Sequence, residues 1–206
     1  MKERGIIFNA EMVRAILEGR KTQTRRLVNS VPTTHDFHGW IMSSTCAKDE
    51  GKAVWAIGDS PLLKDPIRLN CPLGKIGDRL WVRETWQCGL CTESTFAYKA
   101  THKPTDLEEG WNEKIKWRPS SQMPRWASRI LLEITGVRVE RLQSISEEDA
   151  KADGFDNSQS DAAHSIGWFE KPIRTFRRAW ENIYGADGWD SNPWVWVIEF
   201  KQIQEG

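Results

Sequence analysis

The sequence is poor in cysteine and histidine and contains no long apolar run. Four cysteines in 206 residues are too sparse for a disulfide framework, so reduced thiols are expected. No run of about 18 apolar residues is available for a membrane-spanning helix, and the amino-terminal stretch lacks the pattern of a signal peptide. None of the four histidines accompanies a recognisable nucleophile, which gives a Ser-His-Asp hydrolase little support. We therefore expect a soluble, cytoplasmic protein without a membrane partner.

A net charge is also absent. The chain has 29 basic and 29 acidic residues, so it lacks the overall positive field of a non-specific duplex binder. Any contact with nucleic acid should therefore be local. The densest basic cluster could hold one or two phosphates and consists of Arg14, Arg20, Lys21, Arg25 and Arg26.

Tryptophan, by contrast, is abundant, with twelve residues. Burial of a large aromatic ring removes about 150–250 Å² from water, so packing in a core or cleft is the simplest role for most of them. Stacking on nucleobases is the alternative for one or two.

The hydrophobic pattern predicts one α+β domain over residues 1–206. Strands are predicted at residues 79–86, 129–142 and 194–201, with Gly136 marking a bulge or bend in the second. Helices are predicted at residues 11–18, at 147–152 after a capping box that begins at Ser146, and between Pro172 and Gly185. Three polar segments are typical of loops or insertions: about 29–65, 88–122 and 156–170.

Residues 19–26, the motif segment, combine a potential base, two hydroxyls and an arginine pair directly after the first predicted helix. Gly19 supplies the left-handed residue that ends a helix, so the segment should begin in a turn. A threonine hydroxyl becomes a nucleophile beside a base, and a lysine in a desolvated cleft can lose its proton near neutral pH. Lys21 and Thr24 are candidates for this pair, and a solvated basic loop is the alternative.

Glu84 is a second candidate, because the predicted strand turns it toward the same face as Leu80 and Val82. A buried carboxylate needs a partner. Two roles are open: an ion pair with an arginine of the motif segment, or a direct part in catalysis.

Cys88 and Cys91 form a Cys-x-x-Cys pattern that could supply two thiolates to a structural zinc, with Cys46 and Cys71 completing the site. The second pair is irregularly spaced, and Cys71 also belongs to a Cys-Pro-x-Gly turn. We therefore expect no cofactor, with structural zinc as the alternative.

The motif segment also resembles the signature of a known family. Gly19, Lys21, Thr24 and Arg26 match the pattern Gly-x-Lys-x-x-(Thr or Glu)-x-Arg of ASCH domains. The resemblance covers roughly half of the chain, in segments 12–26, 71–86, 123–129, 145–150 and 192–200. It implies a PUA-like β-barrel with short flanking helices and loop insertions. The chain looks like the long, tryptophan-rich branch found in phages and prophages.

Small ASCH members include amidohydrolases that remove the acyl group from N4-acylcytidine with a Lys, a Thr and an acidic residue. The resemblance implies Lys21 as base, Thr24 as nucleophile and Arg26 as a supporting charge. The acid in those enzymes follows a Ser/Thr-Glu-x-x-Ala helix, which places it at Asp153. They carry Glu at that point, and Glu84 is the residue that could compensate for the shorter side chain.

Other ASCH domains are proposed RNA binders, and some cleave single-stranded RNA. A binding role implies a nucleobase, nucleoside, nucleotide or single-stranded RNA, with arginines on phosphate and a tryptophan stacked on a base. The candidates for these contacts are Arg20, Arg25, Arg26, Trp81, Trp86 and Trp126. A ribonuclease would use Lys21 and Arg26 to stabilise the phosphorane, with Asp153 or Glu84 as the base. The remaining alternative is a non-enzymatic phage protein whose insertions bind a host protein.

Overall fold

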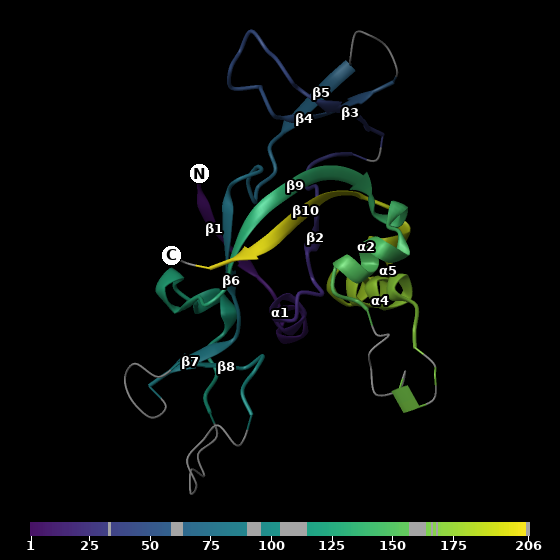
Figure 1. Ribbon diagram of the computed structural model, residues 1–206. Coiled ribbons are helices and arrows are strands. Elements are labelled where there is room, and N and C mark those ends of the chain that lie inside the picture. Colours follow the sequence, from purple (N-terminus) through teal and green to yellow (C-terminus); the bar gives the residue numbers. More distant parts are fainter. Residues whose placement is uncertain are drawn as a thin grey trace, which may run out of the picture.

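A computed structural model describes residues 1–32, 34–58, 64–89, 96–103, 115–156, 164–165, 167 and 169–204. The described part has an α+β fold, as expected, in which a mixed five-stranded sheet is flanked by short helices (Figure 1). The strand order of the sheet is β1-β6-β9-β10-β2. Its strands are β1 (Glu3–Ile7), β2 (Gln23–Leu27), β6 (Arg79–Arg83), β9 (Leu131–Arg141) and β10 (Trp194–Ile203).

This sheet is open, which corrects the expectation of a closed barrel. β1 pairs in parallel with β6, and the other neighbours are antiparallel. β1 and β2 form the two edges, and no described strand joins them. The chain passes between these edges through helix α1 (Ala10–Leu17), so the link between them is helical.

Two of the predicted strands differ in detail from the structure. The run at residues 79–86 divides into β6 and a separate strand β7 (Trp86–Cys88), which pairs with β8 (Phe96–Tyr98). β9 is one long strand whose register against β10 shifts opposite Gly136, where a bulge was expected.

The polar segment at residues 29–65 is not simply a loop. It contains β3 (Asp36–Trp40) and β4 (Ala53–Ile57), which join β5 (Lys64–Leu69) in a three-stranded sheet. Trp55 is fully buried and packs edge-on against Trp196 of β10, with ring centroids 5.6 Å apart. This mostly polar segment therefore has an aromatic core that packs against the main sheet, which its overall composition did not indicate.

The helices follow their local signals closely. α2 (Glu147–Ala152) has the expected capping box at Ser146, and α4 (Pro172–Tyr184) starts at its proline and ends at Gly185. A short helix α5 (Ala186–Asp190) follows, which was not predicted. The 3-10 turns are η2 (Ser120–Gln122), η3 (Arg125–Ala127) and η4 (Leu142–Ser144).

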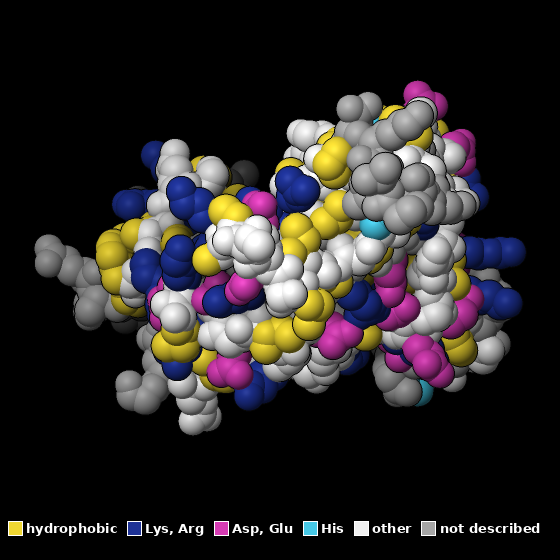
Figure 2. Space-filling model, turned by 90° about the horizontal axis from the view of Figure 1, so that it is seen from above, with side chains coloured by type: hydrophobic (Ala, Val, Ile, Leu, Met, Phe, Trp, Pro, Cys, Tyr) yellow, Lys and Arg dark blue, Asp and Glu magenta, His cyan; other side chains and the backbone are white. Residues whose placement is uncertain are grey.

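Alternation along β10 places a core on each side of the sheet. Trp196, Ile198 and Phe200 pack in one cluster with residues of α1 and the small sheet. Val195 and Val197 pack in the other, with residues of α2, α4 and α5, which gather at one end of the β9–β10 pair in Figure 1. The edge strand β2, which holds the second half of the motif segment, lies beside β10. Basic and acidic side chains are interleaved on the face shown in Figure 2.

Candidate functional site

The motif segment is a turn followed by a buried edge strand. Gly19 has a φ of 73°, and the backbone N–H groups of Arg20 and Lys21 donate to the Ala15 carbonyl (2.8 and 3.0 Å). Lys21 then forms an isolated β-bridge with Asp153, and β2 pairs with β10. The solvated-loop alternative is therefore wrong, because these pairings bury the polar side chains of Lys21 and the first half of β2.

The Lys21 ammonium is buried and has three hydrogen-bond acceptors. Nζ donates to the carbonyl oxygens of Gln23 (2.9 Å) and Asp153 (2.7 Å) and to Oδ1 of Asp153 (3.4 Å). Burial lowers the pKa of Lys21 from 10.5 to about 8, although the Asp153 carboxylate opposes this decrease. The neutral amine, which is the form that can act as a base, is thus accessible at mildly alkaline pH.

Asp153 reaches Lys21 from the end of α2. It is the C-cap residue of that helix, and its side chain is 2% exposed. Oδ1 faces Lys21, while Oδ2 accepts a hydrogen bond from Nη1 of Arg25. Burial raises the pKa of the Asp153 carboxyl, and the charges of Lys21 and Arg25 oppose the increase. These two cations are therefore what stabilises the ionised form of the buried acid.

Thr24 and Arg26 lie on the opposite side of β2 from Arg25. Nη1 of Arg26 donates to Oγ1 of Thr24 (3.0 Å), and Nη2 donates to the carbonyl oxygen of Ile7 (3.2 Å). The Arg26 guanidinium also lies 5.5 Å from the centre of the Phe8 ring. Arg26 thus occupies a lone pair of the Thr24 hydroxyl, whose proton stays available to a base.

These residues line a cavity of about 40 Å³ that adjoins a larger one of about 720 Å³. The small cavity is lined by Lys21, Thr24, Arg25, Arg26 and Asp153, together with Met12, Phe155, Phe176, Ala179, Trp180, Ile183 and Tyr184. Four residues line both cavities: Met12, Phe155, Ala179 and Ile183. The small cavity has room for water, whereas the large one falls in the range of about 300–1,000 Å³ that is common for small-molecule sites.

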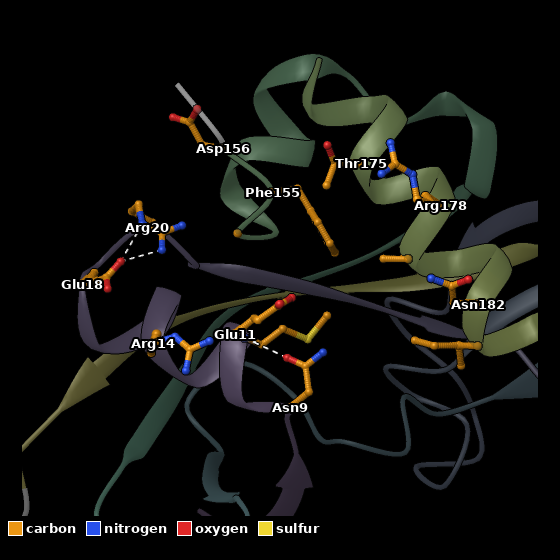
Figure 3. Close-up of a pocket in the computed structure, with 14 residues that line it drawn as sticks. Asn9, Glu11, Arg14, Glu18, Arg20, Phe155, Asp156, Thr175, Arg178 and Asn182 are labelled. Atoms are coloured by element: carbon orange, nitrogen blue, oxygen red, sulfur yellow. Dashed lines mark hydrogen bonds and ion pairs between the residues drawn. The ribbon is translucent and has the colours of Figure 1, made fainter. Parts of the chain in front are cut away.

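The large cavity lies between α1 and α4, and Phe155 projects into it (Figure 3). The Phe155 ring packs edge-on against Phe176, with centroids 5.5 Å apart. Exposed Asn182 and half-buried Thr175 extend from α4 on the facing wall. The site therefore offers an aromatic surface next to groups that can form hydrogen bonds.

Charges of both signs surround this cavity. Arg20 forms an ion pair with Glu18 (2.5 Å), and Nη1 of Arg14 donates to the carbonyl oxygen of Ala100 (2.9 Å). On the α4 side, Arg178 pairs with Glu170. Mixed charge with an aromatic centre suits a small polar ligand better than a long polyanion.

Several lining residues were not identified from the sequence. Phe155 follows Asp153 by two residues, so the end of the α2 helix was a usable signal. Spacing along α4 would place Ile183 on one apolar face with Phe176 and Trp180, which are both buried. Ile183 is instead 64% exposed and lines both cavities. Asn182, its neighbour, carried no pattern that distinguished it from other surface residues.

Glu84 lies in a different environment. It is buried just after β6 and accepts from Nε and Nη2 of Arg129 (2.9 and 3.0 Å), not from an arginine of the motif segment. Both oxygens are therefore occupied by a partner that is itself partly exposed. Glu84 is not among the described residues that line either cavity.

The three candidate tryptophans also lie outside the described lining of both cavities. Trp86 and Trp126 contact each other at right angles, with centroids 5.8 Å apart, and Trp126 is 66% exposed. Trp81 lies under the Arg83 guanidinium, 5.4 Å away. Figure 1 places β7 and β8 across α1 from α4, so Trp86 and Trp126 are separate from the motif cavity.

The cysteines give no zinc site in the part of the chain that the structure describes. Cys46, Cys71 and Cys88 are free thiols, exposed, buried and half-buried respectively. Cys91 lies outside the described residues. Within those residues, no group of three or more His, Cys, Asp or Glu side chains is arranged to hold a metal ion.

No described helix is both long and apolar enough to cross a bilayer.

The chain was compared with known families, proteins and structures. No family model matches the chain, and no curated protein matches it. The chain is similar in structure to protein EF3133 from Enterococcus faecalis V583, whose crystal structure is described under the family name DUF984. The two share 9% identity with a TM-score of 0.42, over 98% of this chain and 81% of that one.

Proposed function

We propose that the protein is an ASCH-type, PUA-like domain that binds a modified nucleobase, a nucleoside or single-stranded RNA in the cavity between α1 and α4. The observation that carries this proposal is that Lys21, Thr24 and Arg26 of the motif segment meet the distant residue Asp153 at one cavity. Because that cavity adjoins a space large enough for a nucleoside, the motif would contact one end of a ligand held there.

Phe155 is the proposed stacking surface for the base. It projects into the large cavity, and it also lines the small one (Figure 3). A base on this ring would have its polar edge near Asn182 and Thr175, which supply an amide and a hydroxyl. Specificity would thus come from α4, and the motif residues would recognise the substituent.

Replacement of Phe155 with leucine should weaken binding of N4-acetylcytidine about 5- to 100-fold, because stacking on an aromatic ring contributes about 1–3 kcal/mol per base. Leucine retains apolar packing against Phe176 and so limits structural damage. Isothermal titration of N4-acetylcytidine, cytidine and a single-stranded hexaribonucleotide measures the change. Trp126→Leu, at an exposed tryptophan outside the described lining, is the matched control and should bind the nucleosides as the wild type does. Equal affinities in the two variants, or no binding to the wild type, would contradict the proposal.

Hydrolysis of the acyl group is a second candidate function, favoured by the lowered pKa of Lys21 and by the shared cavity of Lys21 and Thr24. Neutral Lys21 would take the Thr24 proton, and Oγ1 would attack the acyl carbon. The bond to the cytosine amine would break as that nitrogen receives the proton, and water would then hydrolyse the threonine ester. Nζ now bonds to Gln23 and Asp153, so the first transfer needs a water bridge or a rotation of Lys21.

Hydrolysis should increase with pH up to about 8, because only the neutral Lys21 amine accepts the Thr24 proton. Thr24→Ala should abolish the release of cytidine from N4-acetylcytidine. Thr22→Ala removes an exposed hydroxyl of the same segment and should retain the activity. Chromatography of the products over a pH series checks both results. Activity that survives in Thr24→Ala, or that falls as pH increases from 6 to about 8, would exclude this mechanism.

A further inference from the structure

Arg25 has surroundings that do not suit a surface contact with phosphate. Its side chain is 1% exposed and lies over the Phe176 ring, 5.9 Å from the centre. The neighbouring strand β10 supplies its backbone partner Val197, and α2 covers its charged end through Asp149 and Asp153. A ligand in the large cavity would therefore meet other basic residues first.

The guanidinium divides its N–H groups between three carboxylates. Nη1 donates to Oδ2 of Asp153, and Nη2 lies 3.4 Å from both Glu140 and Asp149. Nε is buried and has no hydrogen-bond partner among the described residues. Asp149 is itself strongly acidic: burial opposes ionisation, but bonds from Gln23 and Ser146 and the charge of Arg25 lower its pKa to about 2.

Asp153 depends on Arg25 more than the other two acids do. Its side chain is buried, whereas the side chains of Glu140 and Asp149 are about a quarter exposed and also bond to Arg138. The contact between Lys21 Nζ and Oδ1 of Asp153 is 3.4 Å, so it is weak for a charge-assisted bond. The closer partner of this carboxylate is Arg25, through its other oxygen.

We propose that Arg25 is a positioning residue for the Lys21–Asp153 pair. It holds Oδ2 of Asp153, so that Oδ1 stays turned toward Lys21, and it keeps the buried carboxylate ionised. The catalytic purpose of the pair rests on the proposed function, in which the ionised Asp153 keeps the Lys21 side chain at the cavity that Thr24 also lines. Asp153 has a shorter side chain than the Glu expected at this position in ASCH amidohydrolases. The bond from Arg25 to Oδ2 holds this shorter side chain from the side away from Lys21.

The test is an NMR titration of the ¹³C carboxyl of Asp153 in wild type, Arg25→Gln and Arg25→Lys, with no ligand present. In Arg25→Gln the pKa of Asp153 should rise by about one to three pH units, because an adjacent cation stabilises a carboxylate by that amount. Arg25→Lys keeps the charge but not the fork of donors, so its increase should be smaller. Arg138→Gln removes an arginine that pairs with Asp149 and Glu140 but not with Asp153, and should leave this pKa unchanged.

An Asp153 pKa that is the same in wild type, Arg25→Gln and Arg25→Lys would overturn the proposal. So would an equal increase in Arg138→Gln, since that would indicate general loosening of the sheet. If Arg25→Gln does not fold, the comparison of Arg25→Lys with wild type decides the question. Binding of N4-acetylcytidine to the wild type is measured separately. An increase in the Asp153 pKa with no nucleoside binding supports the role of Arg25 and contradicts only the proposed function.

Discussion

Replacement of Asp153 with alanine is expected to lower the free energy of unfolding by about 3–5 kcal/mol, the usual cost of removing one partner from a buried ion pair. The change leaves the Lys21 ammonium and the Arg25 guanidinium buried without their shared acid. Urea unfolding followed by tryptophan fluorescence at pH 7 measures the loss. Glu148→Ala, at an exposed residue of the same helix, is the control and should change stability by no more than about 0.5 kcal/mol.

The difference in free energy of unfolding between wild type and Asp153→Ala should decrease as the pH rises. Without Asp153 the pKa of Lys21 falls below about 8, because the carboxylate was raising it. The unfolded chain, with a lysine pKa near 10.5, then binds more protons than the folded variant, so the stability of the variant rises with pH. The free energy of unfolding of the variant should therefore approach that of the wild type as the pH rises toward about 8. A deficit no larger than that of Glu148→Ala, or one that widens over this range, would contradict the assignment of a buried ion pair.

Replacement of Trp55 with alanine should lower the free energy of unfolding by about 3–5 kcal/mol, as is usual for truncation of a buried tryptophan. Trp55 packs against Phe37 of β3 and Trp196 of β10, with centroids 5.5 and 5.6 Å away. The expected result is loss of the three-stranded sheet before the main sheet unfolds. Hydrogen exchange, monitored strand by strand, tests this order.

Trp55→Phe is the matched variant for that experiment. The indole Nε1 is buried with no hydrogen-bond partner among the described residues, and phenylalanine removes this unsatisfied donor while retaining an aromatic ring. The loss should therefore be much smaller, about 1 kcal/mol. An equal loss of unfolding free energy in Trp55→Ala and Trp55→Phe would contradict this account. It would show that Nε1 of Trp55 has a hydrogen-bond partner and that ring packing does not hold the small sheet on the main one.

The helices could be predicted well because their signals are local. Ser146 begins a capping box whose partner lies three residues away, and Pro172 and Gly185 bracket α4. The register shift of β9 at Gly136 was also indicated by its sequence. The sheet of β3, β4 and β5 was missed because its core consists of a few aromatic residues within a polar segment, and their partner Trp196 is far away in the sequence.

The sequence by itself determined the α+β class, the turn at Gly19, and the chemical groups of the motif segment. Only the tertiary structure decided what those groups contact. Pairing of β2 with β10 buries Arg25, and Lys21 bridges to Asp153 at the end of α2. Asp153 thereby contacts both cations across more than a hundred residues. A pKa depends on burial and on charges within a few ångströms, and both arise from long-range packing. For the same reason, local patterning could not have assigned Glu84 to Arg129.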